Sequence, residues 1–425
     1  MLVTLATCRS SFADEPVEWI AGQMPNLLST YRHLHAHPEV SFDEGQTAVY
    51  LTERLQALGA EVTTDVGGHG FVAMLRNGEG PTLMIRSDLD ALPVTEQTDL
   101  PYASQVTHTD ESGRDVGVMH ACGHDVHMTN LLGAADFLAS HRERWQGTVM
   151  FVGQPAEERG AGAKAMLEDG LFERFARPDM AIALHVDAQM EAGKVGVRGG
   201  FMLANVDSVD IEMKGKGGHG AYPQTTVDPV VEAAYLVVDL QSIVAREIAP
   251  TAPAVVTVGS IHGGTKHNVI SDGCHLQLTV RSYSDEVRQQ LLEAIVRKAK
   301  AVAESFRAAE PEISISEGTP AMYNNPELAA RLGKLFRQLL GDDHVVEVEP
   351  SMGGEDFARY GLAGVPITMF RLGSIDAERL AGYARFEQSP PSLHSPRYYP
   401  DPEPTLTTGL RATIAAVEEL LPPRE

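Results

Sequence analysis

The nine residues from position 119, MHACGHDVH, contain three histidines, one aspartate and one cysteine. Imidazole nitrogen, thiolate sulfur and carboxylate oxygen are the protein ligands that zinc and other divalent transition metals bind. Taken singly, a buried cysteine is more often a small hydrophobic side chain, and a lone histidine is more often a hydrogen-bonded core residue. The stretch therefore indicates a metal site only if side chains of the same types come to it from elsewhere in the chain.

Ligand-type side chains also follow three apolar segments that have the pattern of strands. They are Asp88 and Asp90 after residues 82–87, Glu157 and Glu158 after residues 148–152, and His185 after residues 180–184. Ligands of open α/β sheets bind just beyond the carboxyl ends of the strands, which is where these side chains are expected. His394 lies far along the chain in a proline-rich loop. The combination favours a metal site over a set of unrelated core and surface residues.

The first 200 residues alternate between strand-like and helix-like segments. Near-continuous apolar runs such as TVMFV at 148–152 indicate strands that are buried on both faces. Helical patterns separate these runs, at residues 25–34, 44–58, 129–140 and 162–167. The pattern predicts an α/β domain with a central parallel or mixed sheet that is flanked by helices.

The region from about 203 to 316 has a different order of predicted strands and helices. It predicts, in order, a half-exposed strand, a helix that begins with Asp228-Pro229, two strands joined by a glycine-rich turn, a charged helix and a last strand. This β-α-β-β-α-β order is that of a ferredoxin-like module. Helix-and-strand alternation resumes after Asn325, so the module is expected to be an insertion. The predicted catalytic domain then has two segments, 1–202 and 317–425, around an inserted domain at 203–316.

Composition narrows the classes of partner and the compartment. The chain has 58 acidic and 34 basic residues and a formal charge of −24, which argues against a nucleic-acid or anionic-membrane partner. No apolar run approaches the roughly 18 residues of a membrane span. Three cysteines, at 8, 122 and 274, are not a disulfide framework and favour a reducing, cytoplasmic location. A periplasmic or secreted location stays open if residues 1–13 are the remnant of a longer leader.

Several motifs, in order from about residue 25 to the C-terminus, resemble those of the peptidase family 20 amidohydrolases. They are HLHAHPEVSFDE, IRSDLDALPV, HACGHDVHMTNLLGAA, QPAEERGAGAKAM, GGHGAYP, NVIS, MGGEDFA and SLHSP. The pair HACGHD and QPAEE is the most specific. It is similar to the branch that holds hippurate hydrolase, N-acyl-amino-acid amidohydrolases and indole-acetyl-amino-acid hydrolases. The resemblance implies a two-metal catalytic domain and an inserted lid that dimerises, hence a homodimer.

The resemblance also implies the metal ligands. Many family members have a histidine at the position of Arg86, and in the closer branch the HACGHD motif supplies the missing ligand. The implied set is Cys122 as a bridging thiolate, with His124, Glu158, His185 and His394. Two adjacent divalent ions would keep the thiol deprotonated. Zinc and manganese are favoured, with nickel and cobalt as alternatives, because such a ligand set accommodates several metals.

Other polar residues of the motifs receive supporting roles. Asp88 is expected to orient a metal ligand. Neighbouring residues of the HACGHDVH stretch are expected to support the ligands or to pack; they are His120, Asp125 and His127. Three histidines of the N-terminal helix receive no ligand role and are expected to shape that helix; they are His33, His35 and His37.

The inserted domain supplies a second group of candidates. The resemblance makes His219, in GGHGAYP, a hydrogen-bond donor to the tetrahedral oxyanion, and Asn268 the matching polar contact. Arg281 is expected to bind a substrate carboxylate as a bidentate fork, with a surface salt bridge as the alternative. Gln224 and Ser271 stand where histidine and proline are common in the family, and they bear on substrate preference.

The expected reaction is metal-dependent hydrolysis of N-acyl amino acids, such as N-acetyl or hippurate-like conjugates, to a carboxylic acid and an amino acid. A water that bridges the two ions gives its proton to Glu157, attacks the carbonyl, and Glu157 then protonates the leaving amine. One alternative is a carboxypeptidase or dipeptidase of the same fold. A second is a cysteine hydrolase with Cys122 as nucleophile, which leaves QPAEE and His394 without a role. A third is a binding protein without activity, which the intact Glu157 and ligand set disfavour.

Overall fold

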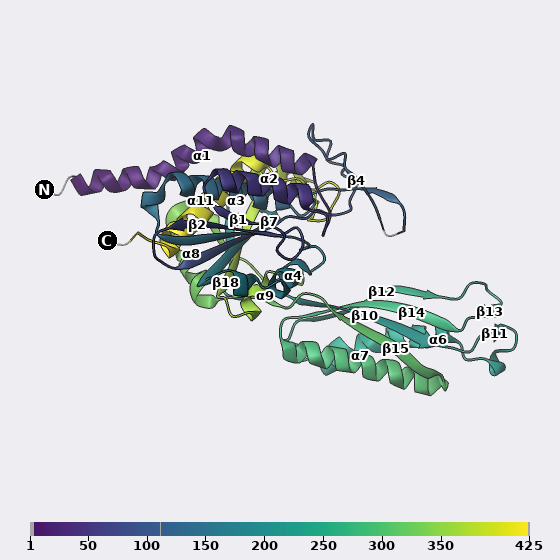
Figure 1. Cartoon of the computed structure of the whole chain (residues 1–425). Coiled ribbons are helices and arrows are strands. Elements are labelled where there is room, and N and C mark those ends of the chain that lie inside the picture. The colour runs from purple at the N-terminus through teal and green to yellow at the C-terminus, as the bar shows by residue number, and fades with distance from the viewer. Residues whose placement is uncertain (1–3, 111, 424–425) are drawn as a thin grey trace. The chain divides into compact units, whose positions relative to one another are not determined.

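The computed structural model describes the backbone of residues 4–110 and 112–423, so the first three residues of the predicted leader remnant lie outside the described residues. The chain divides into two compact units (Figure 1). Unit 1 comprises Met1–Gly200, Tyr323–Glu349 and Arg359–Glu425, and unit 2 comprises Phe201–Met322 and Pro350–Ala358. The domain boundaries at 202/203 and 316/317 stay a prediction.

Unit 1 is built on an eight-stranded mixed sheet with the order β1-β2-β6-β3-β7-β18-β8-β17. Its strands are β1 Glu61–Thr63, β2 Phe71–Asn77, β6 Gly147–Gln154, β3 Thr82–Asp88, β7 Met180–Glu191, β18 Ile367–Ile375, β8 Val195–Val197 and β17 Val345–Glu347. The four central strands, β6, β3, β7 and β18, are parallel, and β2 and β8 flank them in antiparallel pairs. The predicted central mixed sheet is confirmed, and its parallel strands end at one common edge.

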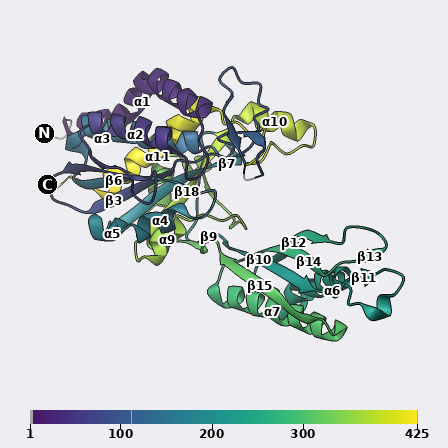
Figure 2. The ribbon, with the colours of Figure 1, turned by 45° about the vertical axis from the view of Figure 1, so that its right-hand side comes forward.

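Helices cover both faces of this sheet. Figure 2 shows α1, α2, α3 and α11 on one side and α4 and α5 on the other. The helices of unit 1 are α1 Thr4–Ala36, α2 Gly45–Ala57, α3 His124–Ser140, α4 Gly162–Glu168, α5 Leu171–Arg174, α8 Pro326–Leu340, α9 Ala358–Leu362, which begins in unit 2, α10 Ala377–Arg385 and α11 Pro402–Leu420. Almost every residue of α3 is buried, so this helix packs in the centre of the unit. A short hairpin, β4 Thr107–Thr109 and β5 Asp115–Gly117, completes the unit.

The first helix is longer than the sequence pattern predicts. It continues through Pro16 and Pro25, residues that normally end or kink a helix because they lack a backbone donor. Ile20, Leu27 and Tyr31 on one side of α1 are buried in the core of unit 1. Burial of this apolar face outweighs the lost hydrogen bonds, as tertiary packing commonly does for helices.

Unit 2 contains a four-stranded antiparallel sheet with the order β12-β14-β10-β15. Its main elements are β10 Asn205–Lys214, α6 Pro229–Ser242, β12 Ala254–Gly263, β14 Gly273–Ser282, α7 Asp285–Phe306 and β15 Ala309–Glu317. The apolar residues of α6 and α7 share one core with alternate residues of the strands, so both helices pack on one face. The predicted ferredoxin-like order is confirmed. The Asp228 carboxylate caps α6 by accepting from the Val230 amide at 3.0 Å, and Pro229 begins the helix as expected.

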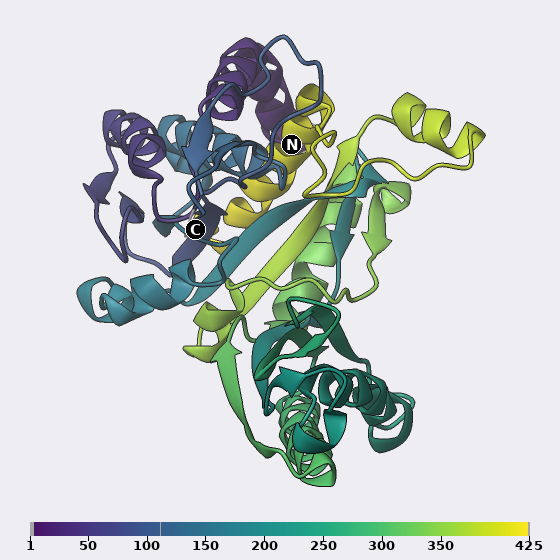
Figure 3. The same cartoon turned by 90° about the vertical axis from the view of Figure 1, so that its right-hand side faces the viewer.

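Short elements complete the description. The pair β11 Gly218–His219 and β13 Val269–Ile270 lies in unit 2, and the unit borders fall at β9 Gly200–Leu203 and β16 Met322–Asn324. In Figure 3, β7 (teal) and β18 (yellow-green) run side by side through the sheet of unit 1. Among the described residues, no helix is long and apolar enough to cross a membrane.

Candidate active site

The predicted metal ligands of unit 1 lie together at the carboxyl edge of its parallel strands. They come from the loop before α3 (Cys122), the first residue of α3 (His124), the turn after β6 (Glu158), β7 (His185) and the loop before α11 (His394). The ligand atoms of Cys122, His124 and His185 lie within 4.8 Å of one another, and so do those of Cys122, Glu158 and His394. Cys122 belongs to both groups, which is the position that a bridging thiolate needs.

Two of the histidines have their tautomers fixed by backbone carbonyls. His124 Nδ1 donates to the Asp90 main-chain oxygen, and His185 Nδ1 donates to that of Val186, both at 2.8 Å. A neutral imidazole that donates through Nδ1 presents a lone pair at Nε2. The Nε2 of His185 lies 3.6 Å from Cys122 Sγ, and that of His124 lies 3.8 Å from Glu158 Oε1.

The spacing of these atoms fits a shared metal ion better than direct hydrogen bonds. His124 Nε2 and Glu158 Oε1 are buried and have no hydrogen-bond partner among the described residues. Buried polar atoms are rarely left without a partner, and a bound ion is one of the standard reasons. Two ligand atoms that each lie about 2 Å from one ion are themselves about 3–4 Å apart. The donor set therefore fits divalent metal ions.

The charges of the site also require a cation. Burial and the carboxylates of Glu158 and Glu157 raise the pKa of the Cys122 thiol well above its usual range. Burial alone would lower the pKa of His124, but Asp88 and the other carboxylates outweigh it and raise that pKa to about 10. Bound divalent ions would reverse the effect on the thiol and favour the thiolate.

The turn that carries Glu157 and Glu158 is held by two buried carboxylates. Asp90 accepts from the amides of Glu157 and Glu158, at 3.1 and 3.0 Å, one with each carboxylate oxygen. Glu44 accepts from the Ala156 amide at 2.7 Å, and Ala156 has a positive φ of 49°. The two glutamates therefore lie in a tight turn and not in extended chain.

In this turn the side chains of the two glutamates lie close together. Glu157 Oε2 lies 3.9 Å from His124 Nε2, and Glu158 Oε1 lies 3.8 Å from the same atom. Extended chain would have sent the two carboxylates to opposite faces. Sequence reasoning did not assign roles to Asp90 and Glu44. Their signal was the occurrence of acidic residues in segments that are otherwise buried.

Asp88 and His127 are engaged with protein groups beside the predicted ligands. His127 Nδ1 donates to Asp88 Oδ1 at 2.7 Å, and His127 Nε2 accepts from the Val186 amide at 3.0 Å. Both ring nitrogens are thus used, although Asp88, His124 and His127 form another compact group of ligand-type atoms. Arg86 donates to the other Asp88 oxygen at 2.7 Å. This ion pair lets the Asp88 carboxylate remain charged when fully buried.

The glycine between Cys122 and His124 is required by the local geometry. Gly123 has a φ of 76°, in the left-handed region that suits glycine. A Cβ atom built there would lie 2.5 Å from Val186 Cγ2. The residue thus lets the loop turn directly into α3 beside β7, and it brings both flanking ligands to the same edge of the sheet.

A buried ion-pair network joins α1 to the start of α3. His35 lies 2.7 Å from Asp125 through Nδ1 and 3.1 Å from Glu96 through Nε2, and all three side chains are almost completely buried. Burial alone would lower the pKa of His35, but its bonds to Asp125 and Glu96 raise the pKa to about 9. His35 is therefore a buried cation, a role that sequence reasoning missed. His120 is also buried, and its ring nitrogens have no hydrogen-bond partner among the described residues.

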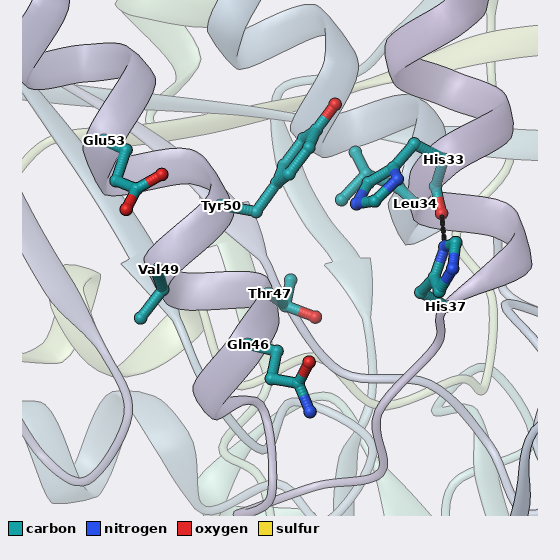
Figure 4. Close-up of a pocket in the computed structure, with 8 residues that line it drawn as sticks. All are labelled: His33, Leu34, His37, Gln46, Thr47, Val49, Tyr50 and Glu53. Carbon is teal, nitrogen blue, oxygen red and sulfur yellow. Dashed lines mark hydrogen bonds between the residues drawn. The ribbon is translucent and has the colours of Figure 1, made fainter.

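The other two histidines of α1 line a hollow at the surface, away from the ligand set. Figure 4 shows His33 and His37 opposite Tyr50 and Glu53 of α2, around a cavity of about 320 Å³. His33 stacks on Tyr50 with ring centroids 4.1 Å apart, and His37 Nδ1 donates to the His33 main-chain oxygen at 2.7 Å. These contacts pack the end of α1 against α2.

The remaining candidates belong to unit 2. His219 pairs with Val269 across the β11–β13 ladder, and the Gly220 amide donates to the Asn268 main-chain oxygen at 2.9 Å, so His219 and Asn268 are neighbours. His219 Nδ1 accepts from the Ala221 amide at 3.0 Å, which leaves Nε2 as the N–H donor of the ring. Arg281 donates to the Met352 main-chain oxygen at 2.6 Å and forms no ion pair with the described residues.

Comparisons with known proteins agree with the site. The chain matches Peptidase family M20/M25/M40 over residues 84–384. It is 38% identical over 363 residues to the N-acetyldiaminopimelate deacetylase of Limosilactobacillus reuteri, covering 83% of this chain and 91% of that protein. It is 36% identical over 373 residues to the IAA-amino acid hydrolase ILR1-like 2 of Arabidopsis thaliana, covering 88% of this chain and 80% of that protein.

A solved structure is similar over nearly the whole chain. It is that of the Bacillus subtilis YXEP protein, described as a dinuclear metal-binding peptidase from the M20 family. The TM-score is 0.74 and the identity 30%, with 92% of this chain and 97% of the other covered. The resemblance inferred from the motifs is thereby confirmed.

The His35 network predicts a loss of stability at alkaline pH. The folded-state pKa of about 9 lies above the ordinary value of 6.5, so the stabilisation is complete below pH 6.5 and is lost as the pH rises through 9. A shift of this size corresponds to roughly 3 kcal/mol in the free energy of unfolding. Urea unfolding of metal-free protein, followed by tryptophan fluorescence, measures this for unit 1, which holds both Trp19 and Trp145.

The matched variants are His35→Gln and His37→Gln, the second at an exposed position on the same helix. His35→Gln should be less stable at pH 6.5 and should show a smaller decline between pH 6.5 and 9, with only the part due to His124 remaining, and His37→Gln should behave as wild type. An unchanged decline in His35→Gln would assign the titration to other groups.

Proposed function

This chain belongs to Peptidase family M20/M25/M40, and we propose that it hydrolyses the amide bond of N-acyl amino acids with two bound divalent metal ions. The observation that carries the proposal is the pair of ligand groups that share Cys122, with Glu157 beside them. Names of the relatives, a deacetylase of an N-acetylated amino acid and a hydrolase of amino acid conjugates, support this substrate class. The products are a carboxylic acid and an amino acid.

The proposed metal ligands are the five side chains of the two groups. Cys122 belongs to both groups and would be shared by the two ions, with His124 and His185 completing one group and Glu158 and His394 the other. Zinc and manganese are favoured, and nickel and cobalt suit the same ligand types. When bound, such ions polarise the substrate carbonyl and lower the pKa of water toward ~7 from 15.7.

Glu157 is the proposed general base and acid. Glu157 is only 8% exposed, and its backbone amide donates a hydrogen bond to the Asp90 carboxylate at 3.1 Å. The carboxylate takes a proton from the attacking water and then gives it to the leaving amine. Because Asp90 holds the amides of both glutamates, one carboxylate can bind metal while its neighbour stays in position to move the proton.

We assign the residues of the predicted lid, 203–316, to the substrate. The His219 ring presents its N–H at Nε2, as a donor to the developing oxyanion must, and Asn268 is its immediate neighbour. Arg281 keeps one guanidinium edge for a substrate carboxylate, since Nη1 donates to Met352 and Nε to Thr279. His219 acts either after closure within one chain or from a second subunit.

The surface of unit 2 suits a homodimer. Three apolar residues of α6, Val231, Tyr235 and Val238, follow one another at helical spacing and are exposed, the last two by 64% and 73%. β12 is an edge strand, and an edge strand presents unpaired backbone groups to a partner. A second copy that packs on α6 and β12 would cover both features.

The proposed compartment is the cytoplasm. Cys122 and Cys274 are buried free thiols. A thiolate ligand must stay reduced to bind metal, which a reducing compartment ensures. A periplasmic or secreted location remains the alternative for a chain that carries a longer leader.

The rival reactions differ in what the site offers. A cysteine hydrolase needs an activated thiolate, but burial and neighbouring carboxylates raise the pKa of Cys122. His185 Nε2 lies 3.6 Å from Cys122 Sγ. A metallo-carboxypeptidase or dipeptidase would use the same metal ligands, so substrate tests must separate it from the amidohydrolase.

Metal dependence and substrate class are tested together. As-purified protein should hold up to two divalent ions per chain, and exhaustive chelation should abolish hydrolysis of hippurate, N-acetyl or indole-acetyl amino acids. Adding back each metal should restore it. Elemental analysis and an amine-release assay make the measurement, with dipeptides as the comparison substrates. Full activity in metal-free protein would contradict the proposal, and faster cleavage of dipeptides would favour the peptidase alternative.

The adjacent glutamates should give opposite phenotypes. Glu157→Gln keeps the size of the side chain but cannot take a proton, so kcat should fall at least about 100-fold while metal content stays near wild type. Glu158→Gln should instead lose metal, because an amide is a poorer ligand. Elemental analysis and steady-state kinetics decide, and exchanged phenotypes would reverse the two roles.

The donor role of His219 predicts a defect confined to the chemical step. His219→Ala should bind metal normally, keep KM within a few-fold and lose on the order of 100-fold in kcat. If the donor acts across subunits, mixing His219→Ala with Glu157→Gln chains should restore activity through hybrid dimers. Verified hybrids without recovery would leave closure within one chain, and a near-normal kcat would make His219 a structural loop residue.

A further inference from the structure

A positively charged side chain lies next to the metal ligand His185 on the neighbouring strand. In the parallel pair of β18 with β7, Arg371 is directly opposite His185. Neighbouring strands are about 4.8 Å apart, and residues paired in this way project from the same face of the sheet. The guanidinium of Arg371 therefore extends from the face that carries His185, within unit 1.

No protein group in the described part of the chain neutralises this charge. Arg371 is half-buried, and among the described residues it has neither a hydrogen bond nor an ion pair to its side chain. The other arginines near the site are engaged: Arg86 with Asp88, and Arg198 with the Val348 main-chain oxygen. A partly buried guanidinium without an acceptor is costly, and arginine cannot shed its proton.

A glycine on the neighbouring strand lies against the base of the Arg371 side chain. Gly196 of β8 is its antiparallel partner, and a Cβ built on that glycine would lie 3.1 Å from Arg371 Cβ and 2.3 Å from Val348 Cγ1. Any larger residue at 196 would press on the arginine from the other side. Glycine at this position thus keeps the side chain in place beside β7.

The electrostatics of the working site point to an anionic partner from outside the protein. Divalent ions on His185 and the other ligands would repel a bare guanidinium in their neighbourhood. An anion that arrives with the substrate would offset both charges at once, and the planar fork of arginine matches a carboxylate in a bidentate pair.

We infer that Arg371 binds a carboxylate of the substrate and so determines specificity for anionic N-acyl amino acids. This inference rests on the proposed amide hydrolysis and names the group that the site recognises beside the scissile bond. The carboxylate can be the α-carboxylate of the amino acid, which Arg371 would then share with Arg281, or one at the far end of the acyl group, which would leave the α-carboxylate to Arg281. Both share the same chemistry, and matched substrates separate them.

The test compares wild type with Arg371→Met, which keeps the apolar stem and removes the charge. N-acetylmethionine is paired with its α-amide, and N-glutarylmethionine with N-pentanoylmethionine. Losing one charge-assisted hydrogen bond should lower kcat/KM by roughly 10- to 100-fold for the member that carries the recognised carboxylate, and little for its neutral partner. The affected pair identifies the source. Arg371→Lys should recover only part of the lost kcat/KM, because lysine lacks the planar guanidinium that binds a carboxylate with two hydrogen bonds.

Two controls isolate the role. Metal content of Arg371→Met should equal wild type, and Arg385→Met, an exposed arginine on α10, makes the same change in net charge and should leave all four substrates unaffected. Equal losses on charged and neutral substrates, or no loss on any, would overturn the inference.

A failure of the proposed function is distinguishable from a failure of this inference. If wild type hydrolyses none of the substrates, calorimetric binding of N-acetylmethionine and glutarate to the metal-loaded proteins decides. Binding that weakens in Arg371→Met supports the carboxylate role, and equal binding rejects it.

Discussion

Buried negative charge at the carboxyl edge of the unit 1 sheet is the constraint on which the site depends. Carboxylate oxygens of Asp88, Asp90, Glu157 and Glu158 lie 3.6–3.9 Å from ring nitrogens of His124. Burying such groups without partners costs several kcal/mol each. The fold therefore pairs part of this charge internally, and the remainder creates the affinity for cations.

The four carboxylates divide into two classes by what they bond. Asp88 is held by Arg86 and His127, and Asp90 accepts the amides of the turn, so both serve as fixed supports. Glu157 and Glu158 have their backbones fixed but their carboxylates directed to the centre. Catalysis requires that the reacting groups are held in position by rigid supports, because small displacements lower the rate by large factors.

Sequence reasoning recovered the parts that rest on local patterns. The buried strands, the order of unit 2 and the meeting of Cys122, His124, Glu158, His185 and His394 follow from periodicity, from strand ends and from specific motifs. It missed what depends on long-range contacts. The Asp90 clamp joins residues 67 apart, and the His35–Asp125 pair joins residues 90 apart. An otherwise buried segment marks an acidic residue such as Asp90, but nothing local identifies the residue with which it pairs. Likewise, α1 passes through two prolines only because its buried face compensates.

The path of the chain between the units determines how unit 2 can be excised or transferred to another protein. Residues 350–358 cluster with unit 2, so the chain passes between the units at 200/201, 322/323, 349/350 and 358/359. Unit 2 made from residues 201–322 alone would lack residues 350–358. In the intact chain, Leu203 of β9 forms a bridge with Ser351, and the Ala204 amide donates to the Gly353 main-chain oxygen. Any rotation between the units has to be absorbed by backbone torsions at all these passages together. Because unit 2 consists of two chain segments, it is held far more tightly than a domain on a single linker. A transplanted unit 2 would need both segments.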